Sequence, residues 1–250
     1  MLENRPLRVG TLLWLLAMSG VVALTVIVLP QVIARLPQRV PLGLPLAAAA
    51  SLVQNALIVA AAVWLGIALG RPLGLSAPAL EAAASGGDIV RALKPQLAPA
   101  LLGGVAAGGL LLLAIRWTPA ALVDAGRGLE IPLLVRILYG GVTEETLMRW
   151  GLMTALLWLS WRFLQRGEGM PRQRYVWASA LIASVAFGVL HLPAVMAIGV
   201  ELSAPVVSFV VVGNSLPGLL FGYLYWRYGL EAAIGAHGLA HVVATLAVAL

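Results

Sequence analysis

The side chains of this sequence that could do acid–base chemistry are few, and they lie in apolar surroundings. The three histidines are His191, His237 and His241, and each falls in an apolar stretch of the C-terminal third. An earlier apolar stretch carries the adjacent acids Glu144 and Glu145. A titratable side chain costs about 2.5 to 3.5 kcal/mol to insert into a bilayer, so such groups usually face a protein interior and mark a site. Carboxylates and imidazoles together suggest a site that activates water.

The two acids face different sides of their predicted helix. Glu145 and Arg149 are four residues apart, so they share one helix face and can form an ion pair. Glu144 is rotated by about 100° from Glu145, which leaves its carboxylate available for other contacts. The alternative interpretation is that both acids belong to one structural ion cluster.

The histidines also follow the spacing of contacts on a helix. Phe187 lies one turn before His191 and can pack beside its imidazole. His237 and His241 are four residues apart and project to one face, which suits two ligands of one metal or two donors to one oxygen. The structural alternative for each histidine is a hydrogen bond between helices.

A polar side chain in the predicted span 205–226 adds one more candidate. Asn214 lies three residues before Pro217. It could bind the backbone of a substrate, or it could cap a helix break where the proline removes a backbone donor. We favour the second interpretation.

Composition places these residues in a membrane protein. Hydrophobic residues make up 61% of the 250 residues and charged residues only 10%, whereas soluble domains carry about 25% charged residues. Seven stretches are apolar over roughly the 20 residues that a transmembrane helix needs: 10–30, 43–69, 97–115, 138–161, 175–197, 205–226 and 230–250. We predict an all-α bundle of about seven transmembrane helices, with eight as the alternative, in a single integral membrane domain over 1–250.

The charges indicate the partners and the orientation. The chain has no cysteine, so disulfides and thiol chemistry are excluded. The net charge is +6, but the sequence has no basic stripe with interleaved aromatic residues. This favours the lipid bilayer over nucleic acid as a partner. The arginine cluster within 162–174 predicts a cytoplasmic loop and hence a cytoplasmic N-terminus. Arg35 and Arg39 disagree, because this topology places them outside.

Depth in the bilayer connects the candidate residues. At the rise of a helix, Glu144 and His191 lie about 27 and 25 Å from the cytoplasmic arginine cluster. His237 and His241 lie about 15 and 21 Å beyond Arg227, which follows from the same rise. Four groups on three helices therefore reach a common band in the outer half of the bilayer, which predicts a single site.

Three sequence motifs on these helices resemble those of the CPBP family, which groups CAAX prenyl endopeptidases with bacteriocin-processing and immunity-type membrane proteins. The segments EETLMR (144–149), FGVLH (187–191) and HGLAH (237–241) are similar to the EExxxR, FxxxH and HxxxN/D motifs of that family. The run from Gly218 into His237 is similar as well.

The resemblance divides the chain into two parts. It covers roughly residues 130–245. The segment 130–250 would then form the catalytic core, and residues 1–129 would supply three spans without motif residues.

The resemblance implies an intramembrane glutamic endopeptidase that needs no cofactor. Glu144 would act as the general base on a water molecule, and His191 would help to hold or polarise that water. His237 and His241 would stabilise the oxyanion of the tetrahedral intermediate. Glu145 and Arg149 would be the supporting pair. Phe187 and Asn214 are further candidate supporting residues on the grounds given above.

One position departs from the family pattern and leaves alternatives open. His241 stands where the family has Asn or Asp; an imidazole N–H can donate a hydrogen bond as an amide does. The resulting set of three histidines and a glutamate also matches the ligand types of a zinc site, so a zinc-dependent membrane protease is the second hypothesis. The third is a non-catalytic membrane scaffold, immunity protein or small-solute carrier.

The predicted substrate is a membrane-anchored protein or peptide. Because the site lies toward the outer face, a sorting-type protease that cuts an exported protein near a C-terminal anchor is favoured over a CAAX-type protease, whose site would be reached from the cytoplasm. We therefore expect an integral protein of the bacterial cytoplasmic (inner) membrane.

Overall fold

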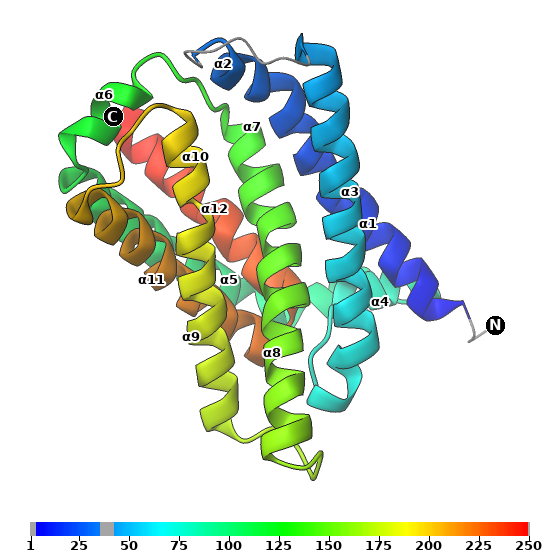
Figure 1. Cartoon of the computed structure of the whole chain (residues 1–250). Helices are drawn as coiled ribbons and strands as arrows, with labels where there is room; N and C mark the ends of the chain where they lie inside the picture. The colour runs from blue at the N-terminus through cyan, green and yellow to red at the C-terminus, as the bar shows by residue number, and fades with distance from the viewer. Residues whose placement is uncertain (1–3, 36–42, 250) are drawn as a thin grey trace.

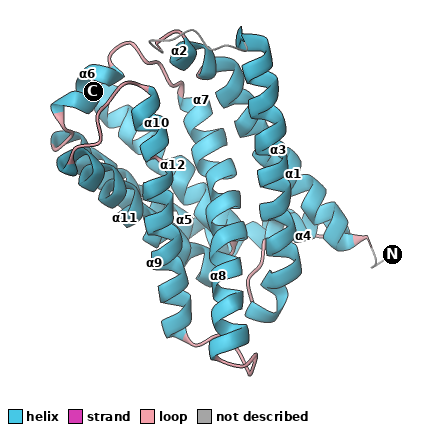
Figure 2. Cartoon of the chain, in the orientation of Figure 1, coloured by secondary structure: helices cyan, strands magenta, loops and turns pink. Residues whose placement is uncertain are grey.

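The computed structural model describes residues 4–35 and 43–249, which form helices joined by short loops (Figures 1 and 2). The described residues contain no strand. Within them, six segments are long and apolar enough to cross a membrane: Arg5–Ile33, Gly43–Leu73, Ile89–Arg116, Gln173–Ala197, Ala204–Tyr228 and Leu230–Val248. The prediction of a helical membrane bundle is confirmed, and the protein is an integral membrane protein.

The predicted span at 138–161 lies in a further helical stretch over residues 133–164, which we call the glutamate helix. It consists of α7 (Leu133–Val135), η2 (Arg136–Glu144), η3 (Thr146–Met153), α8 (Thr154–Leu159) and η4 (Ser160–Leu164). The three η segments have π-helical hydrogen bonding, which is frequent at functional sites. At about 1.5 Å per residue a stretch of this length can cross a bilayer.

The glutamate helix lies between two groups of helices (Figure 1). On one side α1 packs against η2 and α3 packs against η3; on the other, α9 packs against η3 and α12 against η2. The remaining long helices pair as α12 with α5 and α11 with α9. The bounds are α1 (Arg5–Ile27), α2 (Leu29–Ile33), α3 (Gly43–Gly70), η1 (Arg71–Leu73), α4 (Pro78–Ser85), α5 (Ile89–Arg116), α6 (Ala120–Gly126), α9 (Gln173–Leu190), α10 (Leu192–Ala197), α11 (Ala204–Tyr228) and α12 (Leu230–Ala249).

The third span, predicted at 97–115, begins earlier in the structure. The short helix α4 ends at Ser85 and is followed by Gly86, whose φ of +69° is the left-handed conformation that glycine adopts easily. The next helix then starts at Ile89, because the Asp88 carboxylate accepts a hydrogen bond of 2.9 Å from the backbone N–H of Arg91. The third span therefore begins eight residues earlier than the apolar pattern indicates.

The helix break predicted near Pro217 is wrong. Helix α11 continues through this proline without interruption. The Asn214 side chain donates a hydrogen bond of 2.8 Å to the carbonyl of Val210 in its own helix, so it caps no helix end. Neighbouring helices and polar side chains allow a proline within a transmembrane helix.

Helix α1 approaches the glutamate helix so closely that a glycine is required. The Thr143 hydroxyl donates a hydrogen bond of 2.6 Å to the carbonyl of Ala17. A Cβ atom at Gly20 would overlap Oγ1 of Thr143 and the carbonyl oxygen of Leu138. We expect Gly20→Ala to destabilise the protein by about 1 to 3 kcal/mol, because overpacking forces the two helices apart.

Thermal unfolding of the purified protein in detergent measures this effect. Gly109→Ala is the matched control, since a Cβ at Gly109 would have no heavy atom within 4 Å. Equal unfolding temperatures for Gly20→Ala and Gly109→Ala would contradict the predicted close approach of α1.

Candidate active site

An apolar cavity of about 720 Å³ reaches the predicted chemical groups. Its lining extends from residues of α2, α6 and α10 down to Glu144. These three short helices lie at the end of the bundle opposite the loop between α8 and α9 (Figure 1). Six of the eight predicted site residues line the cavity: Glu144, Phe187, His191, Asn214, His237 and His241.

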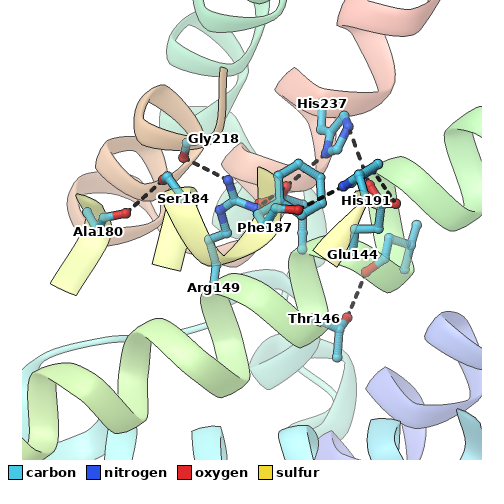
Figure 3. A network of polar contacts seen from close by, with 11 residues as sticks. Glu144, Thr146, Arg149, Ala180, Ser184, Phe187, His191, Gly218 and His237 are labelled. Atoms are coloured by element: carbon cyan, nitrogen blue, oxygen red, sulfur yellow. Dashed lines mark hydrogen bonds and ion pairs between the residues drawn. The ribbon is translucent and has the colours of Figure 1, made fainter. Parts of the chain in front are cut away.

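The carboxylate of Glu144 faces two imidazoles that come from separate helices (Figure 3). Nε2 of His191 is 3.8 Å from Oε1 of Glu144, and Nε2 of His237 is 4.0 Å from Oε2. Both distances are too long for a direct hydrogen bond. In either pair, a water about 2.8 Å from the nitrogen and about 2.8 Å from the oxygen could bridge the two atoms. The Glu144 side chain is 16% exposed, so the cavity gives access to the carboxylate.

Hydrogen bonds fix which nitrogen of each imidazole faces Glu144. Nδ1 of His191 donates to the carbonyl of Phe187 at 2.8 Å, and Nδ1 of His237 donates to the Glu145 carboxylate at 2.8 Å. A carbonyl and a carboxylate oxygen accept hydrogen bonds, so each Nδ1 carries the hydrogen. In each neutral ring Nε2 is therefore an acceptor that can receive a hydrogen from water.

His191 is held at the end of a helix. Helix α9 ends at Leu190, and α10 begins directly after His191 with Pro193 in its first turn. The Phe187 ring and the imidazole pack edge to face, with centroids 4.6 Å apart and planes at 87°. The packing expected from the spacing of these two residues is present, and it fixes the ring beside Glu144.

The Glu145–Arg149 ion pair lies behind the cavity. Nη1 of Arg149 is 3.0 Å from Oε1 of Glu145, and the two side chains are 1% and 0% exposed. Nη2 of Arg149 donates a hydrogen bond of 2.7 Å to the carbonyl of Gly218 (Figure 3). The guanidinium also lies 5.3 Å from the ring centroid of Phe187 and 5.6 Å from that of Phe221. The predicted pair is thus a buried support of the site.

Sequence reasoning missed two residues that shape the space around the last histidines. The rings of His237 and His241 lie 5.1 Å apart at 27°, and Phe221 stacks on His237 at 4.6 Å. A Cβ atom at Gly140 would come within 2.8 Å of Nε2 of His241 and 3.4 Å of Nε2 of His237. Glycine therefore leaves room for both rings. The detectable signal is the Gly-Gly pair one turn before the acids.

The positions of the His, Asp and Glu side chains indicate whether the site could bind a metal ion. Within 4–35 and 43–249, no group of three or more His, Cys, Asp or Glu side chains is placed to hold a metal ion. The Nε2 atoms of His191 and His237 still point an acceptor toward Glu144, as zinc ligands would. Zinc therefore stays a hypothesis for experiment.

Comparison with known families agrees with the motif positions. Residues 127–243 match the family model described as "Type II CAAX prenyl endopeptidase Rce1-like". This part of the chain, which we call the Rce1-like segment, is similar to that family. The Rce1-like segment contains all eight predicted site residues, confirms the resemblance to CAAX prenyl endopeptidases, and supports a membrane protease of this family. No curated protein and no solved structure matches the chain.

Proposed function

We propose that this protein is an intramembrane glutamic endopeptidase that hydrolyses a peptide bond in a membrane-anchored protein. The observation that carries the proposal is the meeting of Glu144 and the acceptor nitrogen of His191 across one water-sized gap in an apolar cavity. The Rce1-like match supports a protease that works on membrane-anchored peptides.

The gap between Glu144 and His191 suits a nucleophilic water. A water there would donate one hydrogen to Oε1 of Glu144 and the other to Nε2 of His191. Its lone pair would then be free to attack a substrate carbonyl. Glu144 would take the proton as the bond forms and pass it to the leaving amine.

Two rings are placed to stabilise the oxyanion. His241 stacks beside His237, so both face the same part of the cavity. Nε2 of His237 can donate only when the ring is doubly protonated, because Nδ1 is bonded to Glu145. The Glu145 carboxylate would stabilise that imidazolium, as a carboxylate does in other hydrolase sites.

The direction of the cavity supports a substrate on the outer face. The cavity lies toward the end that carries α2, α6 and α10, whereas the arginine-rich loop is at the opposite end. If that loop is cytoplasmic, the N-terminus is cytoplasmic too. The finer proposal is a sorting-type protease of the bacterial inner membrane that cuts an exported protein near its C-terminal anchor.

We expect His191→Ala to abolish cleavage of membrane-anchored proteins by the purified protein in lipid nanodiscs, because the water loses one of its two acceptors. We expect treatment with a strong zinc chelator to leave wild-type cleavage unchanged, since the proposed chemistry uses the glutamate alone as the base. Mass spectrometry of the cleaved proteins measures both effects.

The outcomes separate the three hypotheses. Loss of cleavage on chelation, restored by added zinc, would replace the glutamic mechanism with a zinc mechanism at the same residues. Wild-type cleavage by His191→Ala would remove the water-holding role. A biological phenotype that survives Glu144→Gln would indicate a non-catalytic scaffold or immunity protein.

A further inference from the structure

A second cavity lies between the start of α1, the end of α3 and helix α4, and it shares no lining residue with the active-site cavity. Its volume is about 90 Å³, and its lining includes Arg5, Arg71 and Glu81. We call it the arginine pocket. It is much smaller than the roughly 300 Å³ at which sites for drug-sized molecules begin, so it suits a small chemical group.

The arginine pocket carries more positive than negative charge. Nη2 of Arg5 is 3.0 Å from Oε2 of Glu81, and both side chains are partly exposed. This ion pair holds the Arg5 guanidinium in place and leaves its other N–H groups as donors. Arg71 is exposed and forms no ion pair with any part of the chain that the structure describes. One guanidinium of the pocket is therefore uncompensated.

The inner wall of the arginine pocket is apolar. Val9 and the Trp150 ring are buried there, and Ile67 lies beside them. A Cβ atom at Gly66 would overlap the Trp150 ring, so glycine at this position of α3 admits the indole. The indole N–H donates a hydrogen bond of 3.2 Å to the carbonyl of Val63, so the ring offers the pocket only apolar surface.

Both arginines of the pocket lie where a membrane span ends. Arg5 is the first residue of the span Arg5–Ile33, and Arg71 is two residues from the end of the span Gly43–Leu73. Span ends lie near the lipid headgroups, where long arginine side chains keep their charge in the polar layer. The pocket thus places guanidinium groups at headgroup level beside an apolar wall, which is the order of phosphate and acyl chain in a phospholipid.

We propose that the arginine pocket binds the headgroup of an anionic phospholipid. The lipid phosphate would accept hydrogen bonds from Arg71 and Arg5, and the adjoining part of the acyl chain would contact Val9 and Ile67. A zwitterionic lipid fits less well, because the acid of the pocket, Glu81, is already paired with Arg5 and leaves no partner for an ammonium group. The inference is independent of the proposed function of Glu144.

The test measures which lipid the protein retains. The full-length protein, purified in detergent, is incubated with an equimolar mixture of phosphatidylglycerol and phosphatidylcholine that carry the same acyl chains. We expect about tenfold more bound phosphatidylglycerol, the usual strength of a hydrogen bond between charged groups. Native mass spectrometry of the protein–lipid complexes measures the ratio.

Matched variants locate the binding site. Arg71→Gln should remove most of the preference for phosphatidylglycerol, and Arg71→Lys should keep part of it, because lysine retains the charge but not the planar fork of donors. Arg91→Gln is the control, since Arg91 is also an exposed arginine but lies outside the lining of the pocket. It should keep the wild-type ratio.

Thermal unfolding separates a lipid from a free anion. Phosphatidylglycerol should raise the unfolding temperature of the wild type but not that of Arg71→Gln, because a ligand that binds only the folded state stabilises it. Inorganic phosphate at the same concentration should leave both proteins unchanged, since it has no acyl chain to contact the apolar wall.

Each result decides the proposal. Equal retention of the two lipids by the wild type would overturn it. An equal loss of preference in Arg71→Gln and Arg91→Gln would overturn it as well, because general attraction to a basic surface would then explain the binding. Stabilisation by inorganic phosphate as large as that by phosphatidylglycerol would replace the lipid with a free anion.

Discussion

Glu144→Gln is expected to lower kcat for cleavage of a membrane-anchored substrate by about 10²- to 10⁴-fold, the usual contribution of a positioned general base. The amide has the same shape as the carboxylate but cannot take a proton from water. The two histidines that face this position stay tied to Phe187 and Glu145, so the fold should persist. Single-turnover cleavage in nanodiscs measures the rate, and thermal unfolding measures the fold.

Glu168→Gln is the control for this experiment. Glu168 is an exposed acid in the loop between α8 and α9, remote from the cavity lining. Its substitution should leave cleavage at the wild-type rate. If Glu144→Gln cleaved as fast as this control, the assignment of Glu144 as the base would have to be abandoned.

Arg149→Met is expected to destabilise the protein by about 3 to 5 kcal/mol, because it leaves the buried Glu145 carboxylate without its cation. The Gly218 carbonyl also loses its hydrogen-bond donor, and the rings of Phe187 and Phe221 lose their contacts with the guanidinium. The unfolding temperature in detergent should fall far below that of the wild type.

Two further variants test whether the uncompensated charge of Glu145 causes the loss of stability. Arg127→Met breaks an exposed ion pair whose side chains are 77% and 63% exposed, so it should cost at most about 1 kcal/mol. The double variant Glu145→Gln/Arg149→Met should recover part of the loss, since it removes the uncompensated charge. A single Arg149→Met variant as stable as Arg127→Met would refute the structural role of the pair.

The sequence predicts the meeting of Glu144, His191 and His237 because helices rise by a constant amount per residue. Counting from the arginine-rich loop for Glu144 and His191, and from Arg227 for His237, therefore places groups on different helices in one band of depth without knowledge of their packing. The helical membrane bundle follows from apolar length in the same way. Both predictions rest on quantities that are local to each helix.

Features that depend on the approach of two helices could not be predicted. Gly140 matters because two imidazoles occupy the volume of its missing side chain, and Gly20 matters because α1 touches the glutamate helix there. The orientation of the His237 ring depends on a carboxylate from a different helix. The continuity of α11 through Pro217 depends on its neighbours, which override the local tendency of proline to break a helix.

One carboxylate oxygen of Glu145 touches both Arg149 and His237. Glu145 therefore takes part both in the buried ion pair with Arg149 and in the contact that orients the His237 ring toward the cavity. A substitution of Glu145 that changes the stability of the protein therefore also changes the orientation of the His237 ring. Efforts to stabilise this protein in detergents should therefore leave Glu145 unchanged and substitute residues on helix faces that point to lipid.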